Sequence, residues 1–358
     1  MKALVLSGGA GTRLRPFSHS TPKQLIPVAN RPVLEHVLDN IRALGIEDIG
    51  IVVGDRADVI ADAIGDGARF NARITYLRQD RPLGLAHCVR IARGFLGDDD
   101  FVMYLGDNLL PDGVVDIADA FRASRPAAHV VVHKVPDPRA FGVAELDAHG
   151  RILQLVEKPQ EPRSDLALIG VYFFTRAVHE AVAAIAPSAR GELEITDAIQ
   201  WLLANGRAVT ASEYDGYWRD TGRIEDVLAC NAHLLGGLRS HVAGEVDAAS
   251  RVGAGVVIGS GARVVRSRIE GPAIIGPDTL VEDSHVGPNT AVGRGCVLRA
   301  SRIADSIVLD GAAIDAVPGL SHSLIGKSAT VTARSARPEP DTGLRLVLGD
   351  HSSVEIAA

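Results

Sequence analysis

Residues 3–14 read ALVLSGGAGTRL, a short aliphatic run followed directly by a glycine-rich turn. A run of this length that ends in glycines predicts a buried strand leading into a tight turn. Backbone amides in such a turn, at the carboxyl end of a sheet strand, can approach a phosphate closely. The turn has neither the lysine and hydroxyl pair of a P-loop nor the last glycine of the dinucleotide fingerprint, so the glycines alone do not identify a nucleotide site.

Short β-branched runs alternate with helical stretches from this turn to about residue 235. This alternation predicts an α/β domain with a Rossmann-like, mainly parallel sheet. We expect strands at residues 3–6, 49–53, 74–77, 101–105 and 129–135, and helices at residues 33–44, 57–64, 85–95 and 113–123.

A different pattern begins at about residue 245, where glycine repeatedly follows an aliphatic residue. Aliphatic residues recur every 17 positions in three columns: Val252, Ile269, Val286 and Ile303; Ile258, Ile275, Val292 and Leu309; and Val264, Val281 and Leu298. A coil with one inward aliphatic residue on each of three faces resembles the left-handed parallel β-helix of hexapeptide-repeat proteins. We therefore predict an α/β domain over residues 1–240, a left-handed β-helix over residues 241–333 and a short tail over residues 334–358.

Charge and composition exclude several classes of protein. The 358-residue chain has a formal net charge of -7 and no basic run that could neutralise a nucleic-acid backbone. Its three cysteines, Cys88, Cys230 and Cys296, are far apart and odd in number, which favours free thiols in a reducing compartment. No apolar run approaches the roughly 18 residues of a membrane span. We expect a cytoplasmic protein that binds neither nucleic acid nor membranes.

Two cations follow the glycine-rich turn and could flank one polyphosphate. Arg13 comes two residues after Gly11, and Lys23 lies ten residues further on, within the run TPKQL. Lysine supplies only five of the 37 basic residues, and its compact point charge differs from the planar fork of arginine. The alternative interpretation is an ordinary strand-to-helix turn with surface charges.

Two aspartates stand where the predicted sheet binds ligands. Asp107 follows the strand at residues 101–105, and Asp220 lies at a predicted turn. Two carboxylates that converge on triphosphate oxygens would suit Mg²⁺, which takes one or two protein ligands and keeps several waters. Either aspartate alone could equally cap a turn. The pair Glu157 and Lys158, taken alone, indicates no more than a surface ion pair.

Seven motifs occur in the order and spacing of sugar-nucleotide pyrophosphorylases. They are Gly8-Gly9 to Arg13, Pro22-Lys23-Gln24, Gly84-Leu85-Ala86, Gly106-Asp107-Asn108, Glu157-Lys158-Pro159, Arg190 to Asp197 and Asp220-Thr221-Gly222. With them, the chain closely resembles the glucose-1-phosphate thymidylyltransferases, specifically the long form with a β-helical tail found in deoxysugar and antibiotic pathways. The resemblance covers about two thirds of the chain by motif and the remainder by architecture.

This resemblance implies the nucleotidyltransferase fold and the transfer of a nucleotidyl group from dTTP to glucose 1-phosphate, with Mg²⁺ held by Asp107 and Asp220. It implies a homo-oligomer, and a catalytic set of Arg13, Lys23, Asp107, Lys158 and Asp220. The implied nucleotide-binding residues are Gly8, Gly9, Gly11, Thr12, Arg13, Lys23, Gln24, Gln79, Gly84 and Asp107. The implied sugar-phosphate-binding residues are Asn108, Gly142, Glu157, Lys158, Tyr172 and Arg190.

Three alternatives remain open at this point. The same chemistry could use UTP or another sugar 1-phosphate, because related nucleotidyltransferases share several of the motifs. The β-helix could itself be an acyltransferase, with His285 or His322 as its base, which would make the protein bifunctional. A catalytically inactive sensor or scaffold is the third interpretation.

Overall fold

The computed structural model of the protein describes residues 1–9, 11–147, 150–333 and 343–357. Internal contacts divide the chain into two compact units, Met1–Gly9 with Val33–Asp220 and Ala10–Pro32 with Thr221–Ala358. Each unit has its own hydrophobic core. The boundaries expected at residues 240 and 333 stay predictions, because the contacts instead separate the chain after Gly9, Pro32 and Asp220.

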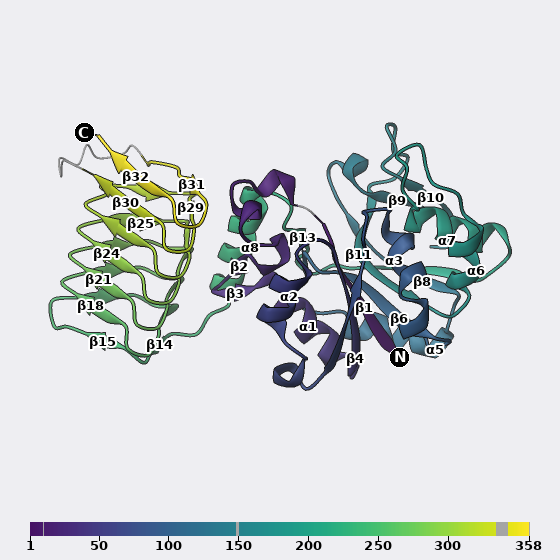
Figure 1. Ribbon diagram of the computed structural model, residues 1–358, viewed down its shortest axis with the longest axis horizontal. Helices are drawn as coiled ribbons and strands as arrows, with labels where there is room; N and C mark the ends of the chain where they lie inside the picture. Colours follow the sequence, from purple (N-terminus) through teal and green to yellow (C-terminus); the bar gives the residue numbers. More distant parts are fainter. Residues whose placement is uncertain (10, 148–149, 334–342, 358) are drawn as a thin grey trace. The chain divides into compact units, whose positions relative to one another are not determined.

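A nine-stranded sheet forms the centre of the first unit (Figure 1). Its main path runs β10-β9-β11-β6-β1-β4-β5, and β8 and β12 extend it beside β11. The neighbours β6, β1, β4 and β5 are parallel, which confirms the Rossmann-like arrangement, whereas β11 is antiparallel to β6, β8 and β9. The strands are β1 (Lys2–Ser7), β4 (Asp48–Val53), β5 (Arg73–Arg78), β6 (Phe101–Leu105), β8 (Ala128–Lys134), β9 (Gly142–Leu146), β10 (Ile152–Glu157), β11 (Leu166–Phe174) and β12 (Val209–Glu213).

Helices cover this sheet because their apolar faces share its core. Side chains of α3, α6 and α7 lie in one hydrophobic cluster with those of β1, β6, β8 and β11. Phe121 of α5 stacks on Phe173 of β11, with ring centroids 5.4 Å apart. The helices are α1 (Val33–Ala43), α2 (Ala57–Ile64), α3 (Leu85–Ile91), α4 (Arg93–Leu96), α5 (Val115–Ser124), α6 (Val178–Ala184) and α7 (Ile195–Ala204), with short 3-10 turns η4 (Ala68–Phe70) and η5 (Pro138–Ala140).

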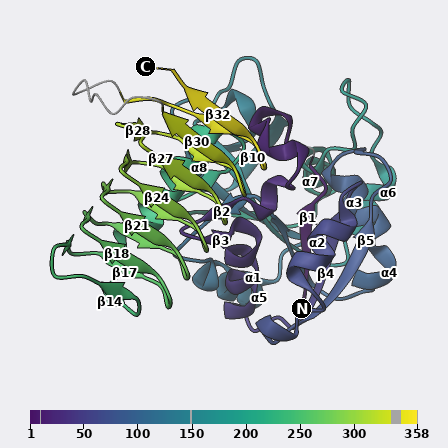
Figure 2. The ribbon, with the colours of Figure 1, turned by 60° about the vertical axis from the view of Figure 1, so that its left-hand side comes forward.

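The second unit contains a three-sided parallel β-helix, consistent with the left-handed form predicted from the sequence (Figure 2). Its first sheet is β14 (His241–Val242), β17 (Val256–Ile258), β20 (Ala273–Ile275), β23 (Thr290–Val292), β26 (Ile307–Val308), β29 (Leu324–Ile325) and β31 (Val347–Leu348). Its second sheet is β15 (Glu245–Val246), β18 (Arg263–Val265), β21 (Leu280–Glu282), β24 (Val297–Arg299), β27 (Ala313–Asp315), β30 (Thr330–Ala333) and β32 (Ser353–Ile356). Its third sheet is β16 (Arg251–Val252), β19 (Arg268–Ile269), β22 (His285–Val286), β25 (Arg302–Ala304) and β28 (Leu320–Ser321).

The register follows the predicted columns, with one correction. Val252, Ile269, Val286 and Ile303 pair in succession, as expected. In the second column, however, Val292 pairs with Val308, so the expected place of Leu309 is wrong. One coil is a residue shorter than the others, and the two adjacent aliphatic residues at 308 and 309 hide this shortening in the sequence.

The expected tail contributes further strands to the β-helix. β31 pairs with β29 and β32 pairs with β30, both in parallel. Residues 334–342 of that tail lie outside the described residues.

The remaining elements of the second unit come from two separate parts of the chain. The first part carries three 3-10 turns and a short hairpin: η1 (Thr12–Leu14), η2 (Phe17–His19), η3 (Lys23–Leu25), β2 (Pro27–Val28) and β3 (Arg31–Pro32). The second is α8 (Ile224–Gly236), which packs against β2 and β23.

Cys88, Cys230 and Cys296 are free and buried, and burial raises the pKa of Cys88 to about 12 and that of Cys296 to about 11. Within the described ranges, none of the helices has the length and hydropathy needed to span a bilayer.

Candidate active site

The two predicted metal ligands stand on one small ladder in the first unit. Asp107 follows β6 directly, and the next residue, Asn108, begins β7 (Asn108–Leu109). β7 pairs antiparallel with β13 (Arg219–Asp220), so that Asn108 lies opposite Asp220. The ladder therefore brings Asp107 and Asp220 close together although 112 residues separate them in the sequence. Asp107 is only 6% exposed.

Asn108 is held in place by its neighbours. Its Nδ2 lies 3.5 Å from Asp107 Oδ1, and its Oδ1 accepts a hydrogen bond of 2.7 Å from the indole Nε1 of Trp218. Gly170, at φ +79° in β11, faces this amide, and a Cβ there would lie 3.0 Å from Asn108 Nδ2 and 2.7 Å from Leu105 Cδ1. Trp218 lies outside the sequence motifs, two residues before Asp220, although a buried amide beside a carboxylate requires a partner of this kind.

Four of the predicted sugar-phosphate residues meet around one carboxylate. Glu157 ends β10 and pairs with Gly142, the first residue of β9. Glu157 Oε1 lies 3.5 Å from Lys158 Nζ and 3.4 Å from Arg190 Nη1. Glu157 Oε2 accepts a hydrogen bond of 3.2 Å from Thr196 Oγ1. Thr196 lies within the motif from Arg190 to Asp197 but is not among the predicted binding residues.

The backbone at this carboxylate is specialised. Lys158 has φ +43°, in the left-handed region, and its amide donates a hydrogen bond of 3.0 Å to the carbonyl of Phe141. Residues other than glycine rarely adopt this conformation, and it recurs at functional sites. Opposite, a Cβ at Gly142 would lie 2.8 Å from both Leu168 Cδ1 and Thr196 Cγ2 and 3.3 Å from Glu157 Oε2, so these side chains pack closely against the bare backbone.

Tyr172 and Arg190 extend the group in different ways. Burial, and then the Glu157 carboxylate, raise the pKa of the Tyr172 hydroxyl above its ordinary value. Arg190 also pairs with Glu192 at 2.8 Å and Glu194 at 3.8 Å. Three carboxylates thus already surround the guanidinium predicted to bind phosphate.

The predicted base-binding residues of the first unit are neighbours as well. Gln79 Nε2 donates to the carbonyl of Gly84 at 3.4 Å and lies 3.0 Å from His87 Nδ1. A Cβ at Gly8 would lie 3.4 Å from Gln79 Oε1. Gly84 has φ +98°, and a Cβ there would lie 2.3 Å from the carbonyl oxygen of Leu193, so this turn requires glycine. His87 was not predicted, and the only signal for it is its place three residues after Gly84.

The remaining predicted residues belong to the second unit, apart from Gly9, which ends the first segment of the first unit. Gly11 has φ +62° and precedes η1, which holds Thr12 and Arg13. A Cβ at Gly11 would lie 3.2 Å from Lys23 Cβ, so the absence of a side chain lets the lysine stem pass closely. Arg13 is exposed, as expected for a cation that meets a solvated ligand.

Gln24 differs from its neighbours because it is almost fully buried, with 1% exposed. Its side-chain oxygen has no hydrogen-bond partner among the residues that the structure describes. A buried amide oxygen without a partner costs free energy, roughly 1–3 kcal/mol, which a bound donor would recover.

Comparison with known proteins agrees with the arrangement of these site residues. The nucleotidyl transferase family profile matches residues 2–236. Over its full length, the chain is 53% identical to a glucose-1-phosphate thymidylyltransferase from Streptomyces griseus, with 100% of both chains covered. A glucose-1-phosphate thymidylyltransferase from Streptomyces antibioticus is 53% identical over 99% of both chains. The chain belongs to the glucose-1-phosphate thymidylyltransferase family.

Structural similarity covers the catalytic part of this thymidylyltransferase family member. A solved structure from Bacillus anthracis, described as a glucose-1-phosphate thymidylyltransferase in complex with a sucrose, is 35% identical. The superposition has a TM-score of 0.61 and covers 65% of this chain and 94% of the other. The nucleotidyltransferase fold and enzyme class predicted from the motifs are thus confirmed.

Proposed function

We propose that this enzyme transfers the nucleotidyl group of dTTP to α-D-glucose 1-phosphate, giving dTDP-glucose and pyrophosphate, the first step of dTDP-deoxysugar synthesis. A phosphate oxygen of the sugar phosphate attacks the α-phosphorus of dTTP, and the bond from that phosphorus to the β-phosphate breaks. The observation that carries the proposal is the full-length similarity to two glucose-1-phosphate thymidylyltransferases, which includes the β-helix as well as the catalytic motifs. Chemistry of this kind requires positioning and charge neutralisation and no covalent intermediate.

The cluster around Glu157 supplies the groups that a sugar phosphate requires. Glu157, the Tyr172 hydroxyl and the backbone at Gly142 would bind sugar hydroxyls. Lys158 would bind the phosphate, because its ammonium lies 3.5 Å from Glu157 and is partly exposed. Arg190 would bind the same phosphate only after releasing one of its three carboxylate partners. Asn108 of β7 would also contact the sugar phosphate.

The residues Asp107 and Asp220 fit a magnesium ion. No group of three His, Cys, Asp or Glu side chains able to hold a metal occurs within the described ranges, which a two-carboxylate site completed by phosphate oxygens and water does not require. When bound, the ion neutralises negative charge on the triphosphate. The chain's own part is to hold the two carboxylates on the β7 and β13 ladder.

We assign Arg13 and Lys23 to the phosphates of the triphosphate. The glycine-rich turn would bind the nucleotide through the backbone amides of Gly8, Gly9, Gly11 and Thr12. Gln24 would use its buried oxygen, and Gln79 and Gly84 their polar groups, to bind the base. A pyrimidine with a ring N–H offers the donor that the Gln24 oxygen lacks. The assembled enzyme would be a cytoplasmic homo-oligomer.

The direct test mixes the purified protein with Mg²⁺, dTTP and glucose 1-phosphate. Pyrophosphate release is followed over time, and the sugar nucleotide is identified by mass. We expect equal amounts of pyrophosphate and dTDP-glucose, and loss of both when EDTA is added. No release with this pair of substrates would contradict the proposal.

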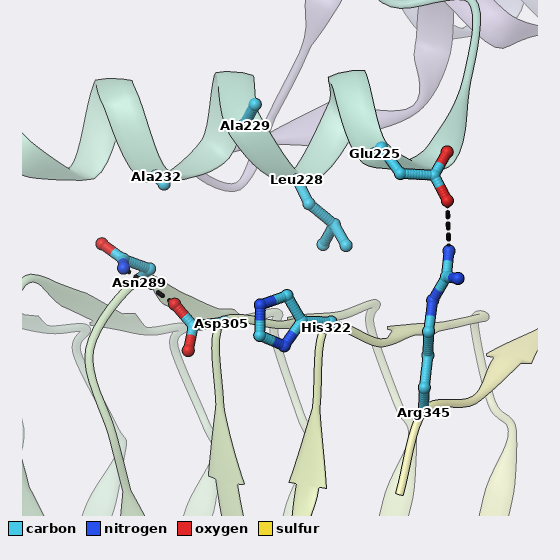
Figure 3. A pocket seen from close by; sticks show the side chains of 8 residues that line it. All are labelled: Glu225, Leu228, Ala229, Ala232, Asn289, Asp305, His322 and Arg345. Carbon is cyan, nitrogen blue, oxygen red and sulfur yellow. Dashed lines mark hydrogen bonds and ion pairs between the residues drawn. The ribbon is translucent and has the colours of Figure 1, made fainter. Parts of the chain in front are cut away.

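The acyltransferase alternative has a separate readout. His285 Nε2 lies 3.4 Å from Glu270 on the β-helix, and His322 lines a cavity beside α8 (Figure 3). We expect no consumption of acetyl-CoA with a hexosamine 1-phosphate, and measurable consumption would establish a second activity.

A further inference from the structure

The last part of the β-helix, residues 344–356, forms a coil that follows a break in the 17-residue repeat. We name it the final coil. Its strands β31 and β32 continue two sheets, and its corner residues Gly349 and Asp350 stand between them. These corner residues face the segment that carries Arg13 and Lys23, because a Cβ at Gly349 would lie 3.3 Å from Pro16 Cβ.

Asp350 joins the final coil to that segment through Oδ2 and to the preceding coil through Oδ1. Oδ1 accepts a hydrogen bond of 2.8 Å from the amide of Lys327, in the preceding coil. Oδ2 accepts hydrogen bonds from Ser20 Oγ at 2.6 Å and from Thr21 Oγ1 at 3.3 Å. Thr21 is buried, with 7% exposed, and hydrogen bonds to a carboxylate are stronger than neutral ones.

Ser20 and Thr21 directly precede Pro22 and Lys23 in the chain. Their position therefore affects the position of the Lys23 backbone. Both residues also bond to the turn that precedes them, since the amides of Ser20 and Thr21 each donate to the carbonyl of Phe17 at 3.0 Å. Proline at position 22 restricts the backbone between the two anchored hydroxyls and Lys23. A displacement of this anchor therefore moves the lysine with it.

The other end of the segment is attached to the same unit. Asn231 of α8 accepts a hydrogen bond of 2.9 Å from the amide of Ala29 and donates one of 3.0 Å to the carbonyl of Asn289. Asn30 Nδ2 donates to the carbonyl of Val292 at 2.7 Å. The segment between Arg13 and Pro32 is thus held in its middle by Asp350 of the final coil, and near its end by α8 and β23.

The final coil also reaches α8 itself. Arg345 forms an ion pair with Glu225 in the first turn of α8 (Figure 3). Beside this pair, a cavity of about 440 Å³ separates Leu228 and Ala232 of α8 from His322 of the β-helix. The Arg345 side chain therefore links the final coil to the first turn of α8 beside this cavity.

We propose that Asp350 is a positioning residue for triphosphate binding, which acts by fixing the Ser20–Lys23 stretch from the β-helix. This inference rests on the proposed function, in which Lys23 binds the triphosphate. It gives the β-helix a role in the reaction without any catalytic group of its own.

The test compares Asp350→Ala with a matched variant, Asp310→Ala. Asp310 occupies the corresponding corner of an earlier coil, where its Oδ1 accepts a hydrogen bond of 2.8 Å from the amide of Arg294. That contact repeats the bond between Asp350 and Lys327, whereas Asp310 accepts no hydrogen bond from the segment of Arg13 and Lys23 among the residues that the structure describes. Both substitutions therefore cost the β-helix one similar hydrogen bond, and only one of them releases Ser20 and Thr21.

We expect Asp350→Ala to raise the KM for dTTP about tenfold, because the loss of one or two charge-assisted hydrogen bonds corresponds to a change of this size. The KM for glucose 1-phosphate should stay within about twofold of wild type. Asp310→Ala should change neither. The double variant Ser20→Ala with Asp350→Ala should bind dTTP no more weakly than Asp350→Ala alone. Equal KM values for dTTP in Asp350→Ala and Asp310→Ala would overturn the proposal.

Hydrogen exchange supplies a readout that does not depend on the substrate. We expect the amides of residues 17–25 to exchange faster in Asp350→Ala than in wild type, and to be unchanged in Asp310→Ala. If wild type fails to use dTTP, the proposed function fails, while faster exchange would still support the anchor. Unchanged exchange in Asp350→Ala overturns the anchor whatever the substrate.

Discussion

The edge of the catalytic sheet and the β-helix encode their structures in opposite ways. At the sheet edge, the important residues are single polar groups from distant parts of the chain, such as Asp107 and Asp220, brought together by a ladder of two residues on each strand. In the β-helix, the signal is an aliphatic residue that recurs at a nearly constant spacing. Chemistry is therefore expected to be sensitive to substitutions in the first region, and stability to substitutions in the second.

The largest effect is expected at the sheet edge. Asp107→Asn removes one charge from the proposed magnesium site while keeping the shape of the side chain. We expect turnover to fall at least about a hundredfold, in line with the loss of one preorganised charged group. Steady-state rates of pyrophosphate release would measure it.

Asp116→Asn is the control for Asp107→Asn, because Asp116 lies exposed in the first turn of α5. It should keep normal turnover. Near-normal turnover of Asp107→Asn would remove this residue from the catalytic set.

In the β-helix, the expected loss is of stability. Leu298 is fully buried between Val281 and Ile314 in the inward column. Leu298→Ala should lower the free energy of unfolding by about 2.5 kcal/mol through lost burial and the cavity left behind. Denaturant unfolding would measure it, and kcat at 25 °C should stay within about twofold of wild type.

Arg299→Ala, one position further along the same strand, is the control for Leu298→Ala. Arg299 is exposed and pairs with Glu282 at 3.2 Å, so its removal should cost less than about 1 kcal/mol. A comparable loss of stability in both variants would contradict the inward position of Leu298.

A smaller and more selective effect is expected at the sugar site. A Cβ at Gly142 would lie 2.8 Å from both Leu168 Cδ1 and Thr196 Cγ2, and 3.3 Å from Glu157 Oε2. Gly142→Ala should displace these groups and raise the KM for glucose 1-phosphate about fivefold, with the KM for dTTP unchanged. Gly94→Ala, where a Cβ meets nothing within 4 Å, should change neither constant. An equal rise in both KM values for Gly142→Ala would argue against a role confined to the sugar.

The last prediction concerns how the free energy of unfolding depends on pH. Burial lowers the pKa of His129 to about 4, and both ring nitrogens lie within 3.0 Å of hydroxyls, those of Thr210 and Ser212. The unfolded chain therefore binds a proton at this histidine between pH 6.5 and 4, and the folded protein does not. Stability should fall as the pH drops through this window, by up to about 2 kcal/mol between pH 7 and pH 5.

His129→Gln isolates this contribution, because glutamine does not titrate. The difference between wild type and variant in the free energy of unfolding should depend on pH below about 6.5. A constant difference from pH 7 to pH 5 would contradict a buried neutral histidine.

Much of the fold could be predicted because it repeats. The alternating strands and helices of the first unit follow from hydrophobic patterning, and the β-helix from its spacing. The antiparallel β11 could not be predicted in this way, because its residues are buried throughout and a continuous apolar run does not reveal strand direction. The final coil was assigned to a tail because 23 residues, instead of 17, separate Ile325 from its partner Leu348.

The sequence predicts most of the residues that form the site, but only part of their contacts with one another. Motif residues such as Glu157 and Lys158 were found, because they keep fixed sequence neighbours. Trp218 and Thr196, which orient other site residues, have no distinguishing pattern of their own. The bond between Ser20 and Asp350 joins residues 330 positions apart, and no periodicity signals a polar contact of that kind.

One competition experiment tests the central claim most directly. The enzyme receives Mg²⁺, glucose 1-phosphate and equal concentrations of dTTP, UTP, GTP, ATP and CTP in one vessel, and the sugar nucleotides formed at early times are quantified by mass. Their ratio gives the ratio of the kcat/KM values for the triphosphates. We predict that dTDP-glucose dominates the products. An equal or larger amount of another nucleotide sugar, or no product at all, would contradict the account.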